Sequence, residues 1–212
     1  MATVISTLFI ALDGVAEVDP DWHFPYFDEA MGNAVGEDYE GTDVLVLGRS
    51  TYESFAGAWP EREAAGGEDA GFAAQLGDLR KVVATRGSQD LGWRNAEPTD
   101  DIVATVAQLR ADDQVDKVVV AGSLSVVRQL LAAGLIDELR LLVHPVAAGR
   151  GEHLFDPTAP VQPLKLLRSA VFPTGVVQLV YAPSELPTPA TYEDVTSQVP
   201  SAEAGQGSAL TD

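Results

Sequence analysis

The chain has 212 residues, and its 32 acidic against 13 basic side chains give it a formal net charge of -19. Such an excess of negative charge repels nucleic acids and anionic membranes, so we expect neither as a partner. The sequence contains no cysteine, which excludes disulfides, thiolate catalysis and thiolate metal sites, and no apolar stretch reaches the about 18 to 20 residues of a membrane span. We therefore predict a cytoplasmic protein.

Apolar segments rich in β-branched residues alternate with helical patterns along most of the chain, which predicts a single α/β domain. Between the last two apolar segments lies Pro173-Thr174-Gly175, a turn sequence that predicts an antiparallel hairpin. The sheet is then mixed. The strands we predict span residues 4–12, 44–47, 81–85, 117–121, 138–144, 164–172 and 176–181.

Three helices are indicated by capping residues and by apolar spacing. Pro25 suits a first helical turn and predicts a helix over residues 25–35. A second helix follows Thr99-Asp100, with apolar residues at a 3.6-residue period. A third is capped by Ser123 or Ser125 and stopped by Gly134.

The composition changes after residue 182, and we divide the chain there into a domain over residues 1–182 and a tail over residues 183–212. The tail is acidic, rich in Pro, Ser, Thr, Ala and Gly, and contains no Lys or Arg. This composition predicts disorder. An alternative is that Tyr192 and Val195 dock onto a partner subunit.

The first candidate binding motif, residues 48–51, directly follows the predicted strand 44–47. Gly48 lets a ligand approach the backbone, Arg49 adds a cation, and Ser50 and Thr51 open a helix. Free N–H groups at a helix start attract phosphate. The alternative is a capped surface helix that carries an exposed arginine.

A second junction of the same kind follows the predicted strand 117–121. Gly122 and Ser123 precede the helix that contains Leu124 and Ser125, so a diphosphate fits there for the same reason. Many strand-glycine-helix junctions in α/β proteins bind nothing, and that is the alternative.

The third motif is Thr85-Arg86, at the end of the predicted strand 81–85. In parallel sheets the carboxyl ends of the strands line the ligand crevice. An arginine there pairs well with an adenosine 2′-phosphate, which favours NADPH over NADH. The alternative is a solvated arginine at a strand end.

The fourth motif leads from Asp13-Gly14 through an aromatic segment to Asp28 and Glu29. An acid beside aromatic side chains can bind or protonate a heterocycle. Acids in a first helical turn also complement the helix dipole without any catalytic role, which is the alternative.

Together these motifs resemble the dihydrofolate reductase superfamily, and in particular stand-alone proteins similar to the reductase domain of the bifunctional riboflavin-biosynthesis deaminase-reductase. The resemblance covers about residues 3–182. The chain lacks the His/Cys zinc signature of the deaminase domain. The segments that carry the resemblance are residues 12–14, 22–29, 48–53, 85–86, 121–123, 134–139, 144–145, 149–151 and 154–155.

The resemblance implies a three-layer α/β/α fold with about eight strands, and hydride transfer from NADPH to a C=N or C=O group of a small heterocycle. Asp28 lies nearest the family's substrate-binding acid, offset by about one residue. The residues implied to hold the cofactor, from nicotinamide to phosphates, are Ile10, Ala11, Gly14, Gly122, Ser123, Leu124, Ser125, Gly48, Arg49, Ser50, Thr51, Thr85 and Arg86. The residues implied to contact the substrate are Trp22, Tyr26 and Phe55.

The resemblance also implies a homodimer. Two further functions stay open: an NADPH-binding sensor or accessory protein without turnover, and an interaction protein that kept the fold but lost the ligand. We expect no metal site, because His23, His144 and His153 are far apart and lack metal-ligand spacing. We expect His144, which precedes a proline, to shape a turn.

Overall fold

The computed structural model describes residues 1–87, 91–187, 191 and 194. Its sheet has eight strands in the order β4-β3-β2-β5-β1-β6-β8-β7. The strands are β1 (Thr3–Ala11), β2 (Val44–Gly48), β3 (Arg80–Ala84), β4 (Ala96–Thr99), β5 (Lys117–Gly122), β6 (Glu138–His144), β7 (Leu164–Val171) and β8 (Val177–Pro183). Neighbours are parallel from β4 to β6, whereas β8 is antiparallel to both β6 and β7. This confirms the mixed sheet and its final hairpin.

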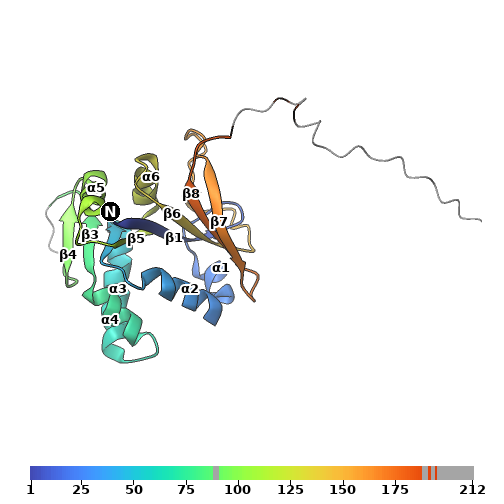
Figure 1. The fold of residues 1–212 in the computed structure, drawn as a ribbon. Coiled ribbons are helices and arrows are strands. Elements are labelled where there is room, and N and C mark those ends of the chain that lie inside the picture. Colours follow the sequence, from blue (N-terminus) through green and yellow to red (C-terminus); the bar gives the residue numbers. More distant parts are fainter. Residues whose placement is uncertain (88–90, 188–190, 192–193, 195–212) are drawn as a thin grey trace, which may run out of the picture.

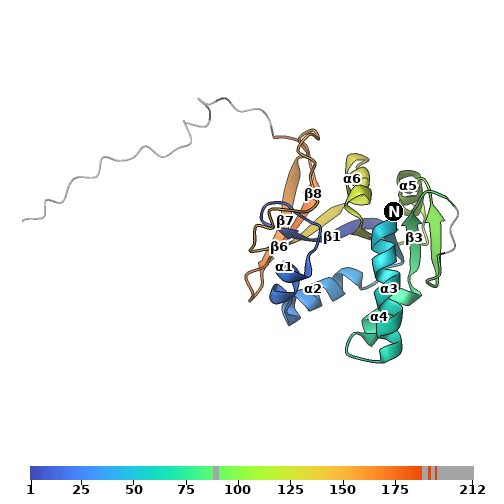
Figure 2. The same ribbon diagram turned by 180° about the vertical axis from the view of Figure 1, so that it is seen from behind.

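Helices cover both faces of the sheet, which gives the three layers (Figure 1). One face carries α5 (Ile102–Ala111) and α6 (Leu124–Ala132). The other carries α2 (Glu29–Tyr39), α3 (Arg49–Ala65) and α4 (Ala70–Asp78), and the view from behind shows the same separation (Figure 2). The short α1 (Pro20–His23) and the 3-10 turn η1 (Phe24–Tyr26) connect β1 to α2.

The side chains of the central strands are apolar almost without interruption and point alternately to the two faces of the sheet. They form one layer of the core on each face. On β2, Val44 and Val46 pack under α5 and α6, while Leu45 and Leu47 pack under α2, α3 and α4. Successive side chains of a strand point to opposite faces, so an uninterrupted apolar run is what a strand covered on both faces requires. The central parallel strands are therefore buried on both sides.

The helix predicted over residues 25–35 is wrong at its start. Pro25 lies in η1, and α2 begins at Glu29. Asp28 is the N-cap of α2, and its Oδ1 accepts a hydrogen bond from the Met31 amide over 2.8 Å. An extended residue whose carboxylate satisfies a free N–H is a strong helix start, and it prevails over a proline three residues earlier.

Three elements have no counterpart among the predicted ones: β4, α4 and the short α1. Glu97 and Pro98 give β4 a sequence with little strand propensity, and it forms through parallel pairing with β3.

The N-cap of α5 is Asp101, one residue after the predicted pair, and its carboxylate accepts from the Ala104 amide over 2.9 Å. Ser123 is the N-cap of α6.

The two edges of the sheet differ in length and polarity. β4 has four residues and contains a proline and a glutamate. β7 has eight residues and leaves Leu166, Leu167 and Val171 exposed by 48%, 45% and 76%. Short, charged or proline-containing edges resist pairing with another chain. β4 is short and contains both a proline and an acid, whereas β7 is longer and carries Lys165 and Arg168 among its exposed apolar residues.

Within the described residues no helix is both long and apolar enough to cross a bilayer. A cytoplasmic location stays a prediction. Tyr192 and Val195, the tail residues that were expected either to be disordered or to contact a partner, lie outside the described residues, as does most of the segment after residue 187.

Candidate active site

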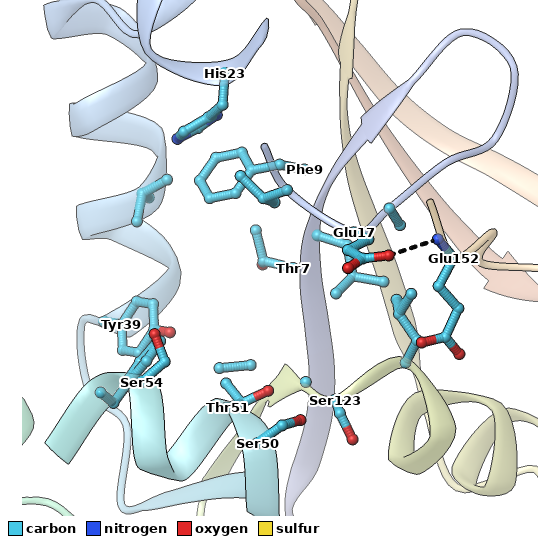
Figure 3. A pocket seen from close by; sticks show the side chains of 18 residues that line it. Thr7, Phe9, Glu17, His23, Tyr39, Ser50, Thr51, Ser54, Ser123 and Glu152 are labelled. Carbon is cyan, nitrogen blue, oxygen red and sulfur yellow. Dashed lines mark hydrogen bonds between the residues drawn. The ribbon is translucent and has the colours of Figure 1, made fainter. Parts of the chain in front are cut away.

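A cavity of about 640 Å³ opens where β1 and β5 meet the helices α2, α3 and α6. Figure 3 shows its wall: His23 and Phe9 lie at one end, and Ser50, Thr51 and Ser123 lie at the other. Glu17 and Glu152 line one side, where the Glu17 Oε2 accepts from the Glu152 amide over 2.9 Å. Ligand sites in open α/β sheets form at the carboxyl ends of the strands, and this cavity occupies that position.

The end formed by Ser50, Thr51 and Ser123, called here the helix-start end, joins the first two predicted motifs. Gly48 ends β2 and is the N-cap of α3, and Ser123 follows β5 and is the N-cap of α6. In the described part of the chain neither N-cap makes a side-chain hydrogen bond to its helix. The first N–H groups of both helices therefore lack a side-chain acceptor, which makes this end suited to an anion.

Close packing at the helix-start end explains both glycines. A Cβ at Gly48 would lie 2.2 Å from the Ser123 Oγ and 2.8 Å from the Ser123 amide nitrogen. Gly122 has a φ of +125°, and a Cβ there would lie 3.0 Å from the Thr51 Oγ1. Larger residues would push the two helix starts apart, so the glycines hold the two junctions together.

The third motif lies beside the first. The Arg49 Nη1 donates to the Thr85 Oγ1 over 3.3 Å, and the Arg49 Nε donates to Glu53 over 2.6 Å. Arg86 is exposed next to Thr85. None of Arg49, Thr85 and Arg86 is part of the cavity wall, so they form a separate basic corner adjacent to the start of α3.

The residues of β1 that line the cavity differ from those predicted to contact the nicotinamide. Ile10 and Ala11 are 5% and 2% exposed and lie outside the cavity wall, and Gly14 lies in the turn that follows. β1 instead contributes Thr7, Leu8 and Phe9 to the wall. At the other end Gly122, Ser123 and Leu124 line the cavity, whereas Ser125 reaches it only through a 3.0 Å hydrogen bond between its Oγ and the Ser123 Oγ.

The opposite end, called here the histidine end, holds a buried pair that the sequence analysis did not assign to the site. The His23 Nδ1 lies 3.1 Å from the His144 Nε2, and the His144 Nδ1 lies 3.0 Å from the Leu142 carbonyl oxygen. The two rings are 6% and 0% exposed. Burial, followed by the neighbouring His144, lowers the pKa of His23 to about 4, and burial lowers the pKa of His144 as well.

Thr7 links the cavity to a buried ion pair. Its Oγ1 donates to the Asp38 Oδ2 over 2.6 Å, and the other carboxylate oxygen of Asp38 accepts from Arg140. Asp38 is 2% exposed. The hydroxyl proton of Thr7 is therefore directed away from the cavity that Thr7 lines.

The sequence of the chain matches a known protein family. The model of the RibD C-terminal domain matches residues 2–178. The chain belongs to this family. It is 27% identical to the Bacillus subtilis (strain 168) protein YyaP over 192 residues, which are 84% of this chain and 93% of YyaP.

Solved structures give the same fold for this RibD C-terminal domain. A putative riboflavin biosynthesis protein from Shewanella sp. PV-4 superposes with a TM-score of 0.66 at 20% identity, over 87% of this chain and all of that one. A pyrimidine reductase-like protein from Corynebacterium diphtheriae gives 0.61 at 16% identity, over 87% and 92%. Acinetobacter baumannii RibD also gives 0.61, at 15% identity, with 87% of this chain and 58% of that one covered.

In this RibD C-terminal domain the predicted substrate residues separate. Phe55 lines the cavity, whereas Trp22 and Tyr26 pack behind the wall on His144, with ring centroids 5.0 Å and 6.0 Å from its ring. Asp28 lies outside the cavity wall. Its Oδ1 caps α2, and its Oδ2 is buried without a hydrogen-bond partner among the described residues.

Among the described residues, no group of three or more His, Cys, Asp or Glu side chains is arranged to hold a metal ion. The His23–His144 pair could not be found from spacing, because 121 residues separate its members. Only the parallel pairing of β1 with β6, which aligns Ala11 with His144, brings the end of β6 beside the segment after β1.

Proposed function

We propose that this protein is an NADPH-dependent reductase that transfers hydride to a C=N or C=O carbon of a small heterocycle. The observation that supports it best is the meeting of two uncapped helix N-termini at one end of a cavity whose other end is aromatic. An anion-binding end and an apolar end are what a dinucleotide and a planar substrate require together. One structural relative is itself described as pyrimidine reductase-like.

The residues fit NADPH. Its diphosphate would be held by the amides that follow Gly48 and by those around Ser123 and Leu124, where both glycine positions leave room for the backbone of the opposite junction. Arg49 and Arg86 would receive the adenosine 2′-phosphate, with Thr85 beside them. When bound, NADPH supplies the hydride from its nicotinamide ring.

The chain's own residues orient the substrate and exclude water. Phe9, Val35 and Phe55 give the cavity an apolar wall against which a planar ring can stack. The proton that completes the reduction would come from Asp28 or from water. The position of Asp28 at the N-cap of α2, outside the cavity wall, favours water.

Calorimetric titration with NADPH and NADH tests the cofactor. Loss of a charge-assisted phosphate contact costs about 1.5–3 kcal/mol, so Arg49→Ala and Arg86→Ala should each weaken NADPH binding roughly 10- to 150-fold and abolish its preference over NADH. Arg80→Ala is the matched control, because this exposed arginine lies at the opposite end of β3 and pairs with Glu97. No heat with either nucleotide would contradict the proposal.

A second function, NADPH binding without turnover, is favoured by one observation: the predicted acid Asp28 satisfies a helix amide and is not in the cavity wall. Stopped-flow measurement of NADPH oxidation with pterins, pyrimidines and ketones separates the two functions. Oxidation with any of these compounds supports the reductase. Tight NADPH binding without oxidation supports the sensor or accessory role.

We also propose that the protein forms a homodimer through β7. β7 is the longer edge of the sheet, and it exposes Leu166, Leu167 and Val171. Leu167→Lys should convert the dimer to a monomer in sedimentation velocity at micromolar concentration, because it places a charge in the apolar contact. Glu97→Lys, a lysine on the opposite edge, should leave the dimer intact. A monomeric wild-type protein would contradict this part.

A further inference from the structure

Among the described residues, four titratable side chains line the cavity: Glu17, His23, Tyr39 and Glu152. We propose that Glu17, in the segment between β1 and α1, supplies the proton that completes the reduction and passes it from solvent to the substrate. The inference rests on the proposed function and deepens it, because it names the group through which a proton of water reaches the reacting atom.

Three of the four side chains are unsuited to donate a proton. Burial lowers the pKa of His23 to about 4, so its ring is neutral, and a neutral imidazole is a very weak acid. Burial raises the pKa of Tyr39, so its phenol holds its proton more tightly than usual. The Glu152 carboxylate pairs with Arg128 over 2.6 Å, and an ion pair favours the charged form of a carboxyl group. Glu17 remains.

The Glu17 carboxyl group is fixed at one oxygen and free at the other. Its Oε2 accepts from the Glu152 amide over 2.9 Å, whereas its Oε1 makes no hydrogen bond within the described part of the chain. In Figure 3 the second oxygen points away from Glu152 and into the cavity. Because Oε2 is an acceptor, the proton of a neutral Glu17 resides on Oε1. The acidic hydrogen therefore faces the space that a ligand would occupy.

Backbone hydrogen bonds hold the segment that carries Glu17 against residues 152–154. The Ala16 amide donates to the Glu152 carbonyl oxygen over 2.8 Å, and the Leu154 amide donates to the Gly14 carbonyl oxygen over 2.9 Å. These bonds lie on both sides of Glu17 in the sequence. The position of its carboxyl group is thus set by the backbone of two segments and does not depend on a single side-chain rotamer.

Arg128 attaches this pair of segments to α6. Its Nε donates to the Leu154 carbonyl oxygen over 2.9 Å, its Nη1 donates to the Glu152 carboxylate over 2.6 Å, and its Nη2 donates to the His153 carbonyl oxygen. The N-terminus of α6 is one of the two helix starts proposed to hold the diphosphate. Glu17 and the cofactor end of the cavity are therefore connected to the same helix.

A bound dinucleotide favours the protonated form of Glu17. Its phosphates bring negative charge into the cavity that Glu17 lines, and the ligand displaces water from the carboxyl group; both effects disfavour a carboxylate. The other charged groups nearby are already engaged: Glu152 pairs with Arg128, and Asp13 accepts from a backbone amide. His153, which forms the bridge to the segment before Glu17, is exposed.

The step balances with NADPH as the reductant. When the carbon of a C=N or C=O group gains the hydride, the electron pair of the double bond moves to the nitrogen or oxygen. That atom takes the proton of the Glu17 Oε1, so an N–H or O–H bond forms as the carboxyl O–H bond breaks. The products are the reduced substrate, NADP⁺ and a Glu17 carboxylate. The carboxylate regains its proton from water, because the side chain is exposed.

Proton uptake on cofactor binding tests the inference without a substrate. NADPH is titrated calorimetrically near neutral pH in buffers of different ionisation enthalpy, and the dependence of the heat on that enthalpy gives the protons taken up. We expect uptake by the wild-type protein that is lost in Glu17→Gln. Glu61→Gln is the matched control, because it removes the same charge at an exposed position on α3 and should keep the uptake. Equal uptake in wild type and Glu17→Gln overturns the inference.

Single-turnover oxidation of bound NADPH tests the step itself, with the fastest compound of the pterin, pyrimidine and ketone panel as the probe. Glu17→Gln should lower the rate by about 10²- to 10⁴-fold while NADPH affinity is kept. The wild-type rate should fall as pH rises, and this fall should be absent in Glu17→Gln. A loss of rate in Asp28→Asn with a wild-type rate in Glu17→Gln assigns the proton to Asp28 and overturns the inference.

Failure of this inference and failure of the proposed function are distinguishable. NADPH binding with the same proton uptake and the same oxidation rate in wild type and Glu17→Gln sustains the reductase and overturns only the role of Glu17. No heat with the wild-type protein contradicts the reductase and this role together. Tight NADPH binding that no compound of the panel oxidises overturns the donor role, even when a proton is taken up.

Discussion

The two ends of the cavity are built on different principles. At the helix-start end, the groups proposed to bind the cofactor are backbone amides, and Gly48 and Gly122 allow the two helix starts to lie close together because they have no side chains. At the histidine end, the polar groups that line the cavity include the side chains of His23 and Thr7, each hydrogen-bonded to a partner outside the cavity wall. One end depends on the space around the backbone, and the other on a chain of donors and acceptors.

The two ends should therefore be sensitive to different changes. An added methyl group should damage the helix-start end because it displaces a helix. A change of protonation should damage the histidine end without moving any backbone, since each hydrogen bond there has a defined direction.

The largest effect is expected from pH at the histidine end. The pKa of His23 is about 4 in the folded protein and 6.5 when unfolded. Between these values the unfolded state binds more protons, so the free energy of unfolding should fall by about 3 kcal/mol as pH falls from 6.5 to 4, and this contribution should level off below pH 4. Urea unfolding at a series of pH values measures it.

The variant His23→Phe should lose this part of the pH dependence, whereas His153→Phe should keep it. Other groups also titrate in this range, so the comparison is the difference between each variant and the wild-type protein at every pH. Parallel curves for wild type and His23→Phe would show that the buried pair does not account for the slope.

A smaller effect is expected from an added methyl group at the helix-start end. Gly48→Ala places a Cβ 2.2 Å from the Ser123 Oγ, and overpacking of this kind costs about 1–3 kcal/mol of unfolding free energy. NADPH binding should weaken as well, because the α3 start moves. Gly57→Ala, on the same helix with no heavy atom within 4 Å of its Cβ, should instead gain about 0.5–1 kcal/mol. Equal stability of the two variants in thermal unfolding would contradict this reading.

The smallest effect is expected from a single hydroxyl. Thr51→Val removes a donor from the cavity wall and preserves the shape of the side chain. One neutral hydrogen bond contributes about 0.5–1.5 kcal/mol, so NADPH binding should weaken roughly 2- to 10-fold by calorimetry while stability stays the same. Unchanged affinity would remove Thr51 from the contact with the cofactor.

The helix-start end could be predicted from the sequence because its signals are local. Each junction consists of a strand, a glycine and the first turn of a helix within a few residues. This pattern can be recognised in the sequence around Gly48 and around Gly122. The parallel sheet then brings their ends together without further information, because β2 pairs with β5. The predicted motifs at Arg49 and Thr85 meet for the same reason, across the pair formed by β2 and β3.

The histidine end could not be predicted in this way. His23 and His144 become partners only through the order of the strands, and Thr7 acquires its direction from Asp38 on α2. For Asp28 the sequence pattern is ambiguous, because an acid before a helix can be either a ligand-binding group or a helix cap. The hydrogen bond that it accepts from the Met31 amide identifies it as a cap. Local patterns predict elements, but side-chain partners need the topology.

The central position of β1 in the sheet has a consequence for synthesis of the chain. β1 is flanked by β5 and β6, and its first pair, Thr3 with Lys117, spans 114 residues. At ribosomal rates of about 5–20 residues per second, roughly 6 to 23 s separate the appearance of the two strands. During that interval the nascent β1, whose Val4, Ile5 and Leu8 are buried in the finished protein, has no native neighbour to pair with. Until β5 and β6 have been made, the apolar side chains of β1 therefore lack the cover that they have in the finished sheet.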